Sequence, residues 1–333
     1  FMEEYHYLLD LALILFTTKL FGLISQKFKM PQVVGALLAG LILGPAVLNI
    51  VQKSNFITTT SEIGVIILMF CAGLETDVKE LKKCGKASFV IALLGVIVPL
   101  LGGFGVAYFF NQPGIIDSGA TCNVFLQNVF IGVILTATSV SITVETLKEL
   151  GRLKSESGNA ILGAAIIDDI LGIIALTVIT SLADSSVNVW IVLLKILGFF
   201  AMVIVAGFAF YKLYVWWANR SKHLRHRHAI ICFVFCLGMS YAAEALFGVA
   251  DITGAFFAGL IISLTQSSEY LAKKFDVLSY LLLSPIFFAS IGLNVVLPSM
   301  SVQIIVFAVV ITIVAIITKI IGCGLGAKIC RYK

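Results

Sequence analysis

Apolar segments of about twenty residues, the length that crosses the hydrocarbon core of a bilayer as a helix, recur along the whole sequence. Lipid offers the backbone no hydrogen bonds, so we expect an all-α polytopic membrane protein; barrel strands would alternate polar and apolar residues. With 60% hydrophobic and 12% charged residues, the composition also excludes an ordinary soluble domain. We assign eleven spans, to residues 5–25, 32–50, 61–78, 87–110, 124–147, 157–183, 188–217, 228–246, 250–266, 275–293 and 301–327.

The basic residues of the loops indicate how the spans are oriented. Loops after odd-numbered spans carry 18 Lys and Arg residues, and loops after even-numbered spans carry 1. Because basic loops stay in the cytoplasm, we place the N-terminus outside and the C-terminus inside. The most basic loop, 220–228, also holds three histidines. We interpret it as a topology signal; a role in pH sensing or in binding anionic lipid is the alternative.

A sequence repeat connects two distant parts of the chain. The segment Gly35–Leu41 reappears as Gly254–Leu260, and the pair Gly73-Leu74 reappears as Gly292-Leu293, both at an offset of 219 residues. Spans 2 and 9 enter the membrane from opposite sides, so the copies are inverted, as in many secondary transporters. The alternative is a pair of unrelated small-residue packing motifs. A complete inverted repeat would have thirteen spans, so we expect two more than the eleven that this sequence contains.

Span 5 contains a cluster of hydroxyl groups at mid-membrane, where five of the eight residues from Thr136 to Thr143 are Ser or Thr. Such side chains compete for backbone hydrogen bonds and stabilise a break in a membrane helix. A broken helix exposes carbonyl groups that can bind a cation. We therefore predict a discontinuous helix here. The alternative is that the hydroxyls form hydrogen bonds between straight helices.

Two adjacent carboxylates, Asp168 and Asp169, lie in the apolar run from Ala160 to Leu182. A charged group at mid-membrane costs on the order of 2.5–3.5 kcal/mol, so the pair indicates a function. The two side chains point about 100° apart around a helix, so one faces the ion path and the other a different partner. Lys319, deep in span 11, is the candidate partner, because pairing offsets the cost of both buried charges. We expect no cofactor and no enzymatic activity.

Several short motifs occur together along the chain. They are Thr136-Ala137-Thr138-Ser139, Gly163-Ala164-Ala165 followed by Asp168-Asp169, Gly73-Leu74-Glu75, Pro285-Ile286-Phe287-Phe288 and Thr318-Lys319. In these motifs the sequence resembles the monovalent cation/proton antiporters, in the bacterial branch of sodium/proton antiporters with paired aspartates, which is related to the Kef-type potassium efflux systems. The resemblance covers essentially the whole chain.

The resemblance implies a role for individual positions. Asp169 matches the family's essential cation- and proton-binding carboxylate, and Asp168 matches the neighbour that pairs with a lysine, here Lys319. Thr138 and Ser139 match the unwound segment beside the ion. The transported Na⁺ would thus be bound by Asp169 and Asp168. The family is homodimeric, with a dimer domain and a core domain that moves as an elevator.

On this pattern the chain divides into dimer-side and core parts. The dimer-side parts are spans 1–3, which share residues 1–110 with core span 4, and spans 8–10 in residues 228–300. The core continues with spans 5–6 and the ion site in residues 111–183 and with span 11 in residues 301–333. Residues 184–227 hold linking span 7 and the basic loop.

These features predict a secondary transporter that exchanges Na⁺ or Li⁺ for H⁺ by alternating access. One carboxylate can bind either ion, but not both, when its pKa lies near the working pH. A second titrating pair, Asp168 and Lys319, would make the exchange electrogenic. The alternative on the same scaffold is a K⁺/H⁺ antiporter or a Kef-type efflux protein.

Two classes of protein other than a transporter fit the sequence poorly. An intramembrane aspartyl protease is excluded because its two aspartates must face each other from separate helices, and a non-transporting sensor would not need the acidic pair.

Overall fold

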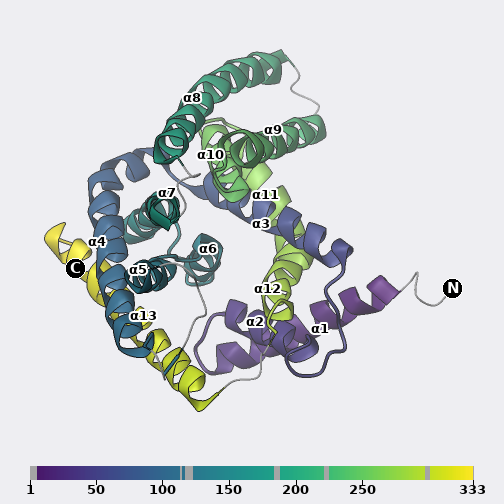
Figure 1. Ribbon diagram of the computed structural model, residues 1–333. Coiled ribbons are helices and arrows are strands. Elements are labelled where there is room, and N and C mark those ends of the chain that lie inside the picture. The colour runs from purple at the N-terminus through teal and green to yellow at the C-terminus, as the bar shows by residue number, and fades with distance from the viewer. Residues whose placement is uncertain are drawn as a thin grey trace. The chain divides into compact units, whose positions relative to one another are not determined.

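The computed structural model describes residues 6–112, 115–116, 123–183, 188–220, 225–296 and 301–332, and the regular structure within these ranges is helical (Figure 1). The helices are α1 (His6–Lys27), α2 (Gln32–Leu43), α3 (Asn55–Glu75), α4 (Val78–Phe110), α5 (Val124–Ile134), α6 (Val140–Glu149), α7 (Glu156–Ala183), α8 (Val189–Arg220), α9 (Arg225–Phe247), α10 (Asp251–Ser263), α11 (Ser268–Leu278), the π-helical turn η2 (Ser279–Leu283), α12 (Ser284–Leu293) and α13 (Val302–Ile329).

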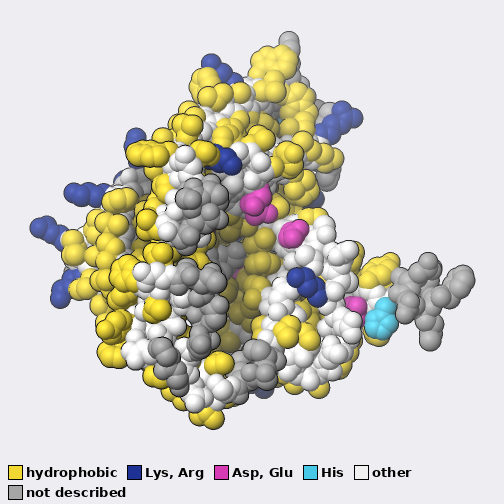
Figure 2. Space-filling model, in the orientation of Figure 1, with side chains coloured by type: hydrophobic (Ala, Val, Ile, Leu, Met, Phe, Trp, Pro, Cys, Tyr) yellow, Lys and Arg dark blue, Asp and Glu magenta, His cyan; other side chains and the backbone are white. Residues whose placement is uncertain are grey.

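Eight of the described helical segments are long and apolar enough to cross a membrane, and three shorter apolar helices (α2, α5 and α10) accompany them. Hydrophobic side chains cover much of the visible surface, as lipid contact requires (Figure 2). The chain is therefore a multi-pass helical membrane protein. The count of eleven spans out of thirteen stays a prediction. The basic loop at 220–228 lies partly outside the described residues, which leave out 221–224.

Four predicted boundaries differ from the helix ends by six residues or more. Span 4 was expected to begin at residue 87 and span 10 at residue 275, but α4 begins at Val78 and α11 at Ser268. Span 2 was expected to reach residue 50, but α2 ends at Leu43, because Gly44 is extended and precedes Pro45, whose ring disfavours helical geometry in the residue before it. Span 3 was expected to begin at residue 61, but α3 begins at Asn55. The Ser54 hydroxyl accepts a hydrogen bond from the Ile57 amide at 3.2 Å and caps that helix.

The chain forms two compact units. Unit 1 comprises Phe1–Val78, Ser141–Lys154 and Phe199–Pro298, and unit 2 comprises Lys79–Val140, Ser155–Gly198 and Ser299–Lys333. Unit 1 thus holds α1–α3 and α9–α12 with most of α6, and unit 2 holds most of α4 with α5, α7 and α13. The chain passes from unit 2 to unit 1 between Val140 and Ser141, at the start of α6.

Glycine contacts inside unit 1 agree with the predicted repeat. A Cβ at Gly40 of α2 would lie 2.0 Å from the Ala289 carbonyl oxygen of α12, and a Cβ at Gly259 of α10 would lie 2.3 Å from the Phe70 carbonyl oxygen of α3. Adding 219 to Gly40 gives Gly259, and subtracting 219 from Ala289 gives Phe70. The same close contact therefore occurs twice, with the two halves exchanged. Only glycine permits helices to approach this closely.

One further contact in unit 1 relates a residue to its own repeat partner. A Cβ at Gly64 of α3 would lie 2.8 Å from the carbonyl oxygen of Leu283, the residue 219 positions later. Exchanging the two halves maps this contact onto itself. Gly64 and Leu283 therefore lie where a two-fold axis relating the halves of unit 1 would pass.

Candidate ion-binding site

The helix of span 5 is broken where the hydroxyl cluster predicts a break. α5 ends at Ile134 and α6 begins at Val140, so residues 135–139 are not helical. The hydroxyl of Thr136 donates a hydrogen bond to the Val133 carbonyl oxygen at 2.8 Å and so satisfies an acceptor at the end of α5. The carbonyl of Thr136 itself lies outside both helices and accepts hydrogen bonds from side chains instead of a helical amide.

Lys319 of α13 joins four parts of unit 2. Its ammonium donates to the Asp168 carboxylate oxygen Oδ2 on α7 at 2.9 Å, to the Thr136 carbonyl in the unwound segment at 2.7 Å and to the Gly95 carbonyl on α4 at 3.0 Å. These three bonds use all three of its donors. The side chain of Lys319 is 23% exposed and that of Asp168 is 5% exposed. The ammonium thus binds a backbone carbonyl, that of Thr136, of the kind that a broken helix exposes to a cation.

The remaining predicted residues surround this ion pair unequally. The Thr138 hydroxyl donates to the Thr136 carbonyl that also binds Lys319, at 3.5 Å, and the other oxygen of the Asp168 carboxylate, Oδ1, is buried without a hydrogen bond to any described residue. Asp169 is partly buried on α7 and makes no hydrogen bond or ion pair with the described residues. Ser139 is exposed at the last unwound position. The structure therefore brings Asp168, Lys319 and Thr138 together, and Asp169 adjoins them along the helix.

Close packing positions the three helices of the site. The Ser88 hydroxyl of α4 donates to the Ala160 carbonyl of α7 at 3.0 Å. On α13, a Cβ at Gly322 would lie 2.5 Å from the Leu94 carbonyl oxygen and one at Gly326 would lie 2.7 Å from the Ile91 Cα, both on α4. Glycines spaced four apart let α13 approach α4 closely enough for Lys319 to reach its acceptors.

No group of three His, Cys, Asp or Glu side chains in the described part of the chain would hold a resident metal.

Sequence reasoning missed both carbonyl acceptors of Lys319. The unwound segment predicted free carbonyls but did not show that Thr136 would supply the one in contact. Gly95 was not considered at all. A signal for it exists, since Pro99 follows it by four residues and cannot donate the hydrogen bond that a helix would provide.

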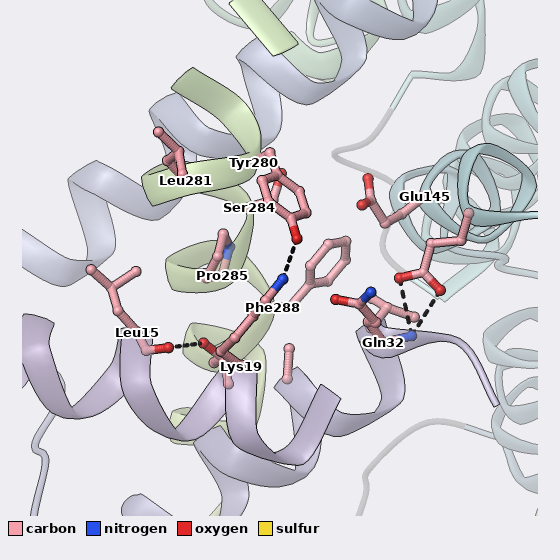
Figure 3. A pocket seen from close by; sticks show the side chains of 13 residues that line it. Leu15, Lys19, Gln32, Glu145, Tyr280, Leu281, Ser284, Pro285 and Phe288 are labelled. Carbon is pink, nitrogen blue, oxygen red and sulfur yellow. Dashed lines mark hydrogen bonds between the residues drawn. The ribbon is translucent and has the colours of Figure 1, made fainter. Parts of the chain in front are cut away.

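A separate cavity of about 290 Å³ lies within unit 1 (Figure 3). It contains the hydrogen bond that Lys19 donates to the Tyr280 hydroxyl. The carboxylate of Glu149 on α6 also lines it and accepts two bonds from the Gln32 amide, at 3.0 and 2.8 Å. The residues lining this cavity are Leu15, Thr18, Lys19, Gln32, Val33, Ala36, Glu145, Glu149, Tyr280, Leu281, Ser284, Pro285 and Phe288, which include none of the predicted ion-site residues.

Known proteins resemble this chain along nearly its whole length. The probable Na⁺/H⁺ antiporter GerT of Bacillus cereus is 39% identical over 327 residues, which are 97% of this chain and 83% of that protein. The Na⁺/H⁺-K⁺ antiporter GerN of Bacillus cereus is 39% identical over 334 residues, 99% and 82% of the two chains. The sodium proton antiporter MjNhaP1 of Methanocaldococcus jannaschii, solved at pH 8, shares the fold with a TM-score of 0.68 and 22% identity, covering 100% of this chain and 80% of its own.

The family profile for the transmembrane part of sodium/hydrogen exchangers matches residues 12–333. That range contains the broken helix, the acidic pair and Lys319. The family consists of transporters, in agreement with the expectation that the chain is not an enzyme. The chain therefore belongs to the sodium/hydrogen exchanger family, within the monovalent cation/proton antiporter superfamily.

Proposed function

We propose that this chain exchanges Na⁺ or Li⁺ for H⁺ across a prokaryotic plasma membrane. The observation that carries the proposal is the ion pair between Lys319 and Asp168 beside a broken helix, with Asp169 adjacent. The names of the relatives GerT and GerN support Na⁺ and H⁺ as the transported ions. Hard monovalent cations are bound by oxygen ligands, and this site offers carboxylate, hydroxyl and carbonyl oxygens.

Asp169 is the exchange site in this proposal. Its carboxylate binds either a proton or a cation, so the two ions compete and cross the membrane in opposite directions. Thr138 and Ser139, together with water, provide further oxygen ligands for the cation. Asp169 suits this role because it makes no hydrogen bond or ion pair with the described residues and is free to take a transported ion.

Asp168 and Lys319 form the second, switchable pair. A cation that binds near Asp168 must compete with the ammonium for the carboxylate and for the Thr136 carbonyl, because both already accept hydrogen bonds from it. Displacing Lys319 removes its counter-charge and favours release of its proton. With two titrating groups in one cycle, the exchange is electrogenic.

The larger motion follows the family pattern. We propose a homodimer with its N-terminus outside, with spans 1–3 and 8–10 on the dimer side and the spans that carry the ion site forming a core that moves as an elevator. Support comes from the division of the chain, since unit 1 contains α1–α3 and α9–α12 and unit 2 contains Asp168, Asp169 and Lys319.

Purified protein in proteoliposomes tests the proposal by dequenching of a pH-sensitive dye when Na⁺, Li⁺ or K⁺ is added. We expect Na⁺ and Li⁺ to release protons in the unaltered protein and Asp169→Asn to abolish the response. Exchange that persists in Asp169→Asn contradicts the assignment of Asp169. A response to K⁺ as strong as that to Na⁺ favours the K⁺/H⁺ alternative, to which the name of GerN gives some support.

A further inference from the structure

Pro99 lies inside α4, four residues after an acceptor of Lys319. In an α-helix the carbonyl of each residue accepts a hydrogen bond from the amide four residues later. Proline has no N–H, so the Gly95 carbonyl lacks its usual intrahelical donor. The ammonium of Lys319 is found 3.0 Å from that oxygen. A donor from α13 thus replaces the one that Pro99 withholds.

Gly95 provides the space for this contact. A Cβ at Gly95 would lie 2.9 Å from the Cys323 sulfur, 3.7 Å from the Lys319 nitrogen and 3.8 Å from the Lys319 Cε. Any larger residue would therefore press on the side chains of α13 that lie over this carbonyl. Pro99 itself is buried, so water does not reach its side of the helix to supply the missing donor. The two residues together leave an open carbonyl that is accessible to the ammonium.

We propose that Pro99 is a positioning residue for Lys319. By withholding its N–H, Pro99 reserves the Gly95 carbonyl for the ammonium and so helps to determine how firmly Lys319 resists displacement by an incoming cation. The inference rests on the proposed function, in which the cation competes with Lys319 for Asp168. Pro99 contacts no transported ion in this scheme and acts only through the lysine.

Replacing Pro99 tests this idea because alanine restores the amide donor. In Pro99→Ala the new N–H takes one of the two lone pairs of the Gly95 carbonyl, and the charge-assisted hydrogen bond from Lys319 to that oxygen is weakened. The ammonium is then displaced more easily. We expect the KM for Na⁺ to fall by about three- to tenfold, which is less than the loss of a whole hydrogen bond to a charged group would give, because the bond is only weakened.

A double-mutant cycle separates this role from a general effect on the helix. The KM for Na⁺ is measured in proteoliposomes for the unaltered protein, Pro99→Ala, Lys319→Met and the double variant. We expect Pro99→Ala to lower KM in the presence of Lys319 and to have no effect in the Lys319→Met background. A purely structural role changes KM by the same factor in both backgrounds.

Gly105→Ala is the matched control. Gly105 lies in the same helix, and a Cβ there would meet nothing within 4 Å, so this substitution also favours helix without approaching Lys319. We expect it to leave KM unchanged in both backgrounds. Pro99→Gly restores the same N–H through a different side chain, and it should lower KM as Pro99→Ala does even if one of the two variants folds poorly.

The outcomes distinguish this inference from the proposed function. If Lys319→Met alters KM or voltage dependence but neither Pro99 variant lowers KM, the positioning role is wrong and the role of Lys319 stands. An equal shift in both backgrounds also overturns the positioning role. If Lys319→Met is indistinguishable from the unaltered protein, the role of Lys319 fails, and the positioning role fails with it.

Discussion

Two lysines in this molecule bind acidic partners in very different settings. Lys148, at the end of α6 in unit 1, bonds to the Asp276 carboxylate and lies 3.6 Å from the Glu75 carboxylate oxygen. The side chains of Lys148 and Asp276 are 26% and 42% exposed, so water screens this pair. Lys319, in unit 2, has one carboxylate partner that is 5% exposed, and its other two acceptors are neutral carbonyls.

This difference bears on which lysine a transported cation would displace in the proposed exchange. Lys148 has more than one negative neighbour, so occupation of one carboxylate by a cation still leaves another partner. Among the described residues, Asp168 is the carboxylate that forms an ion pair with Lys319, and the two carbonyl acceptors carry no net charge. Carbonyl and carboxylate oxygens are also the kind of ligand that a hard cation takes. We infer that Lys148 holds α6 in place and that Lys319 is the exchangeable member of the ion site.

The largest expected difference between the two lysines concerns stability. Lys319→Met leaves the buried Asp168 without a counter-charge, and breaking a buried pair in this way costs about 3 kcal/mol or more of unfolding free energy. Thermal unfolding of the purified protein in detergent measures the loss. Adding Asp168→Asn to Lys319→Met removes the unpaired charge and should recover part of the lost stability. A double variant that is less stable than Lys319→Met contradicts the pairing.

Lys148→Met is expected to have a smaller effect, about 1 kcal/mol, because both of its ion pairs are partly exposed. Electrogenic exchange should persist in this variant, whereas Lys319→Met should change its voltage dependence. Solid-supported membrane currents compare the two variants directly. Lys273→Met provides a control, since the Lys273–Glu269 pair on α11 is fully exposed and should contribute nothing measurable. If Lys148→Met alters voltage dependence as Lys319→Met does, the distinction between the two lysines is wrong.

The sequence predicted the parts of the fold that follow from local patterns. The length of the apolar segments indicated where the membrane helices lie, and the cluster of hydroxyl side chains indicated the break between α5 and α6. Both patterns involve residues that are neighbours in the sequence. The pairing of Lys319 with Asp168 was expected from the desolvation free energy of buried charges, since two opposite charges within a membrane offset that cost by pairing. The helix ends at Leu43 and Asn55 were missed, although Pro45 and Ser54 were visible signals for both.

Contacts between distant residues were beyond the reach of the sequence. Lys19 and Tyr280 are 261 residues apart, and nothing local to either residue indicates that they meet. The Gly95 carbonyl is harder still, because a backbone acceptor has no side chain to mark it. Pro99 indicates that this carbonyl is free, but only the fold shows that Lys319 reaches it.

The smallest expected effect concerns Glu149, the residue after Lys148. α2 begins after Pro31, whose side chain cannot cap the helix. Both carboxylate oxygens of Glu149 instead accept hydrogen bonds from the backbone N–H of Gln32. Glu149→Ala removes this cap and its favourable interaction with the helix dipole, at a cost of about 0.5 kcal/mol. Glu149→Gln keeps one oxygen acceptor and should lose less. Thermal unfolding in detergent ranks the two variants, with exchange measured alongside. Because Glu149, like Lys148, fixes the end of α6 without being displaced, neither variant should alter voltage dependence; if Glu149→Ala does, the end of α6 takes part in the ion exchange itself.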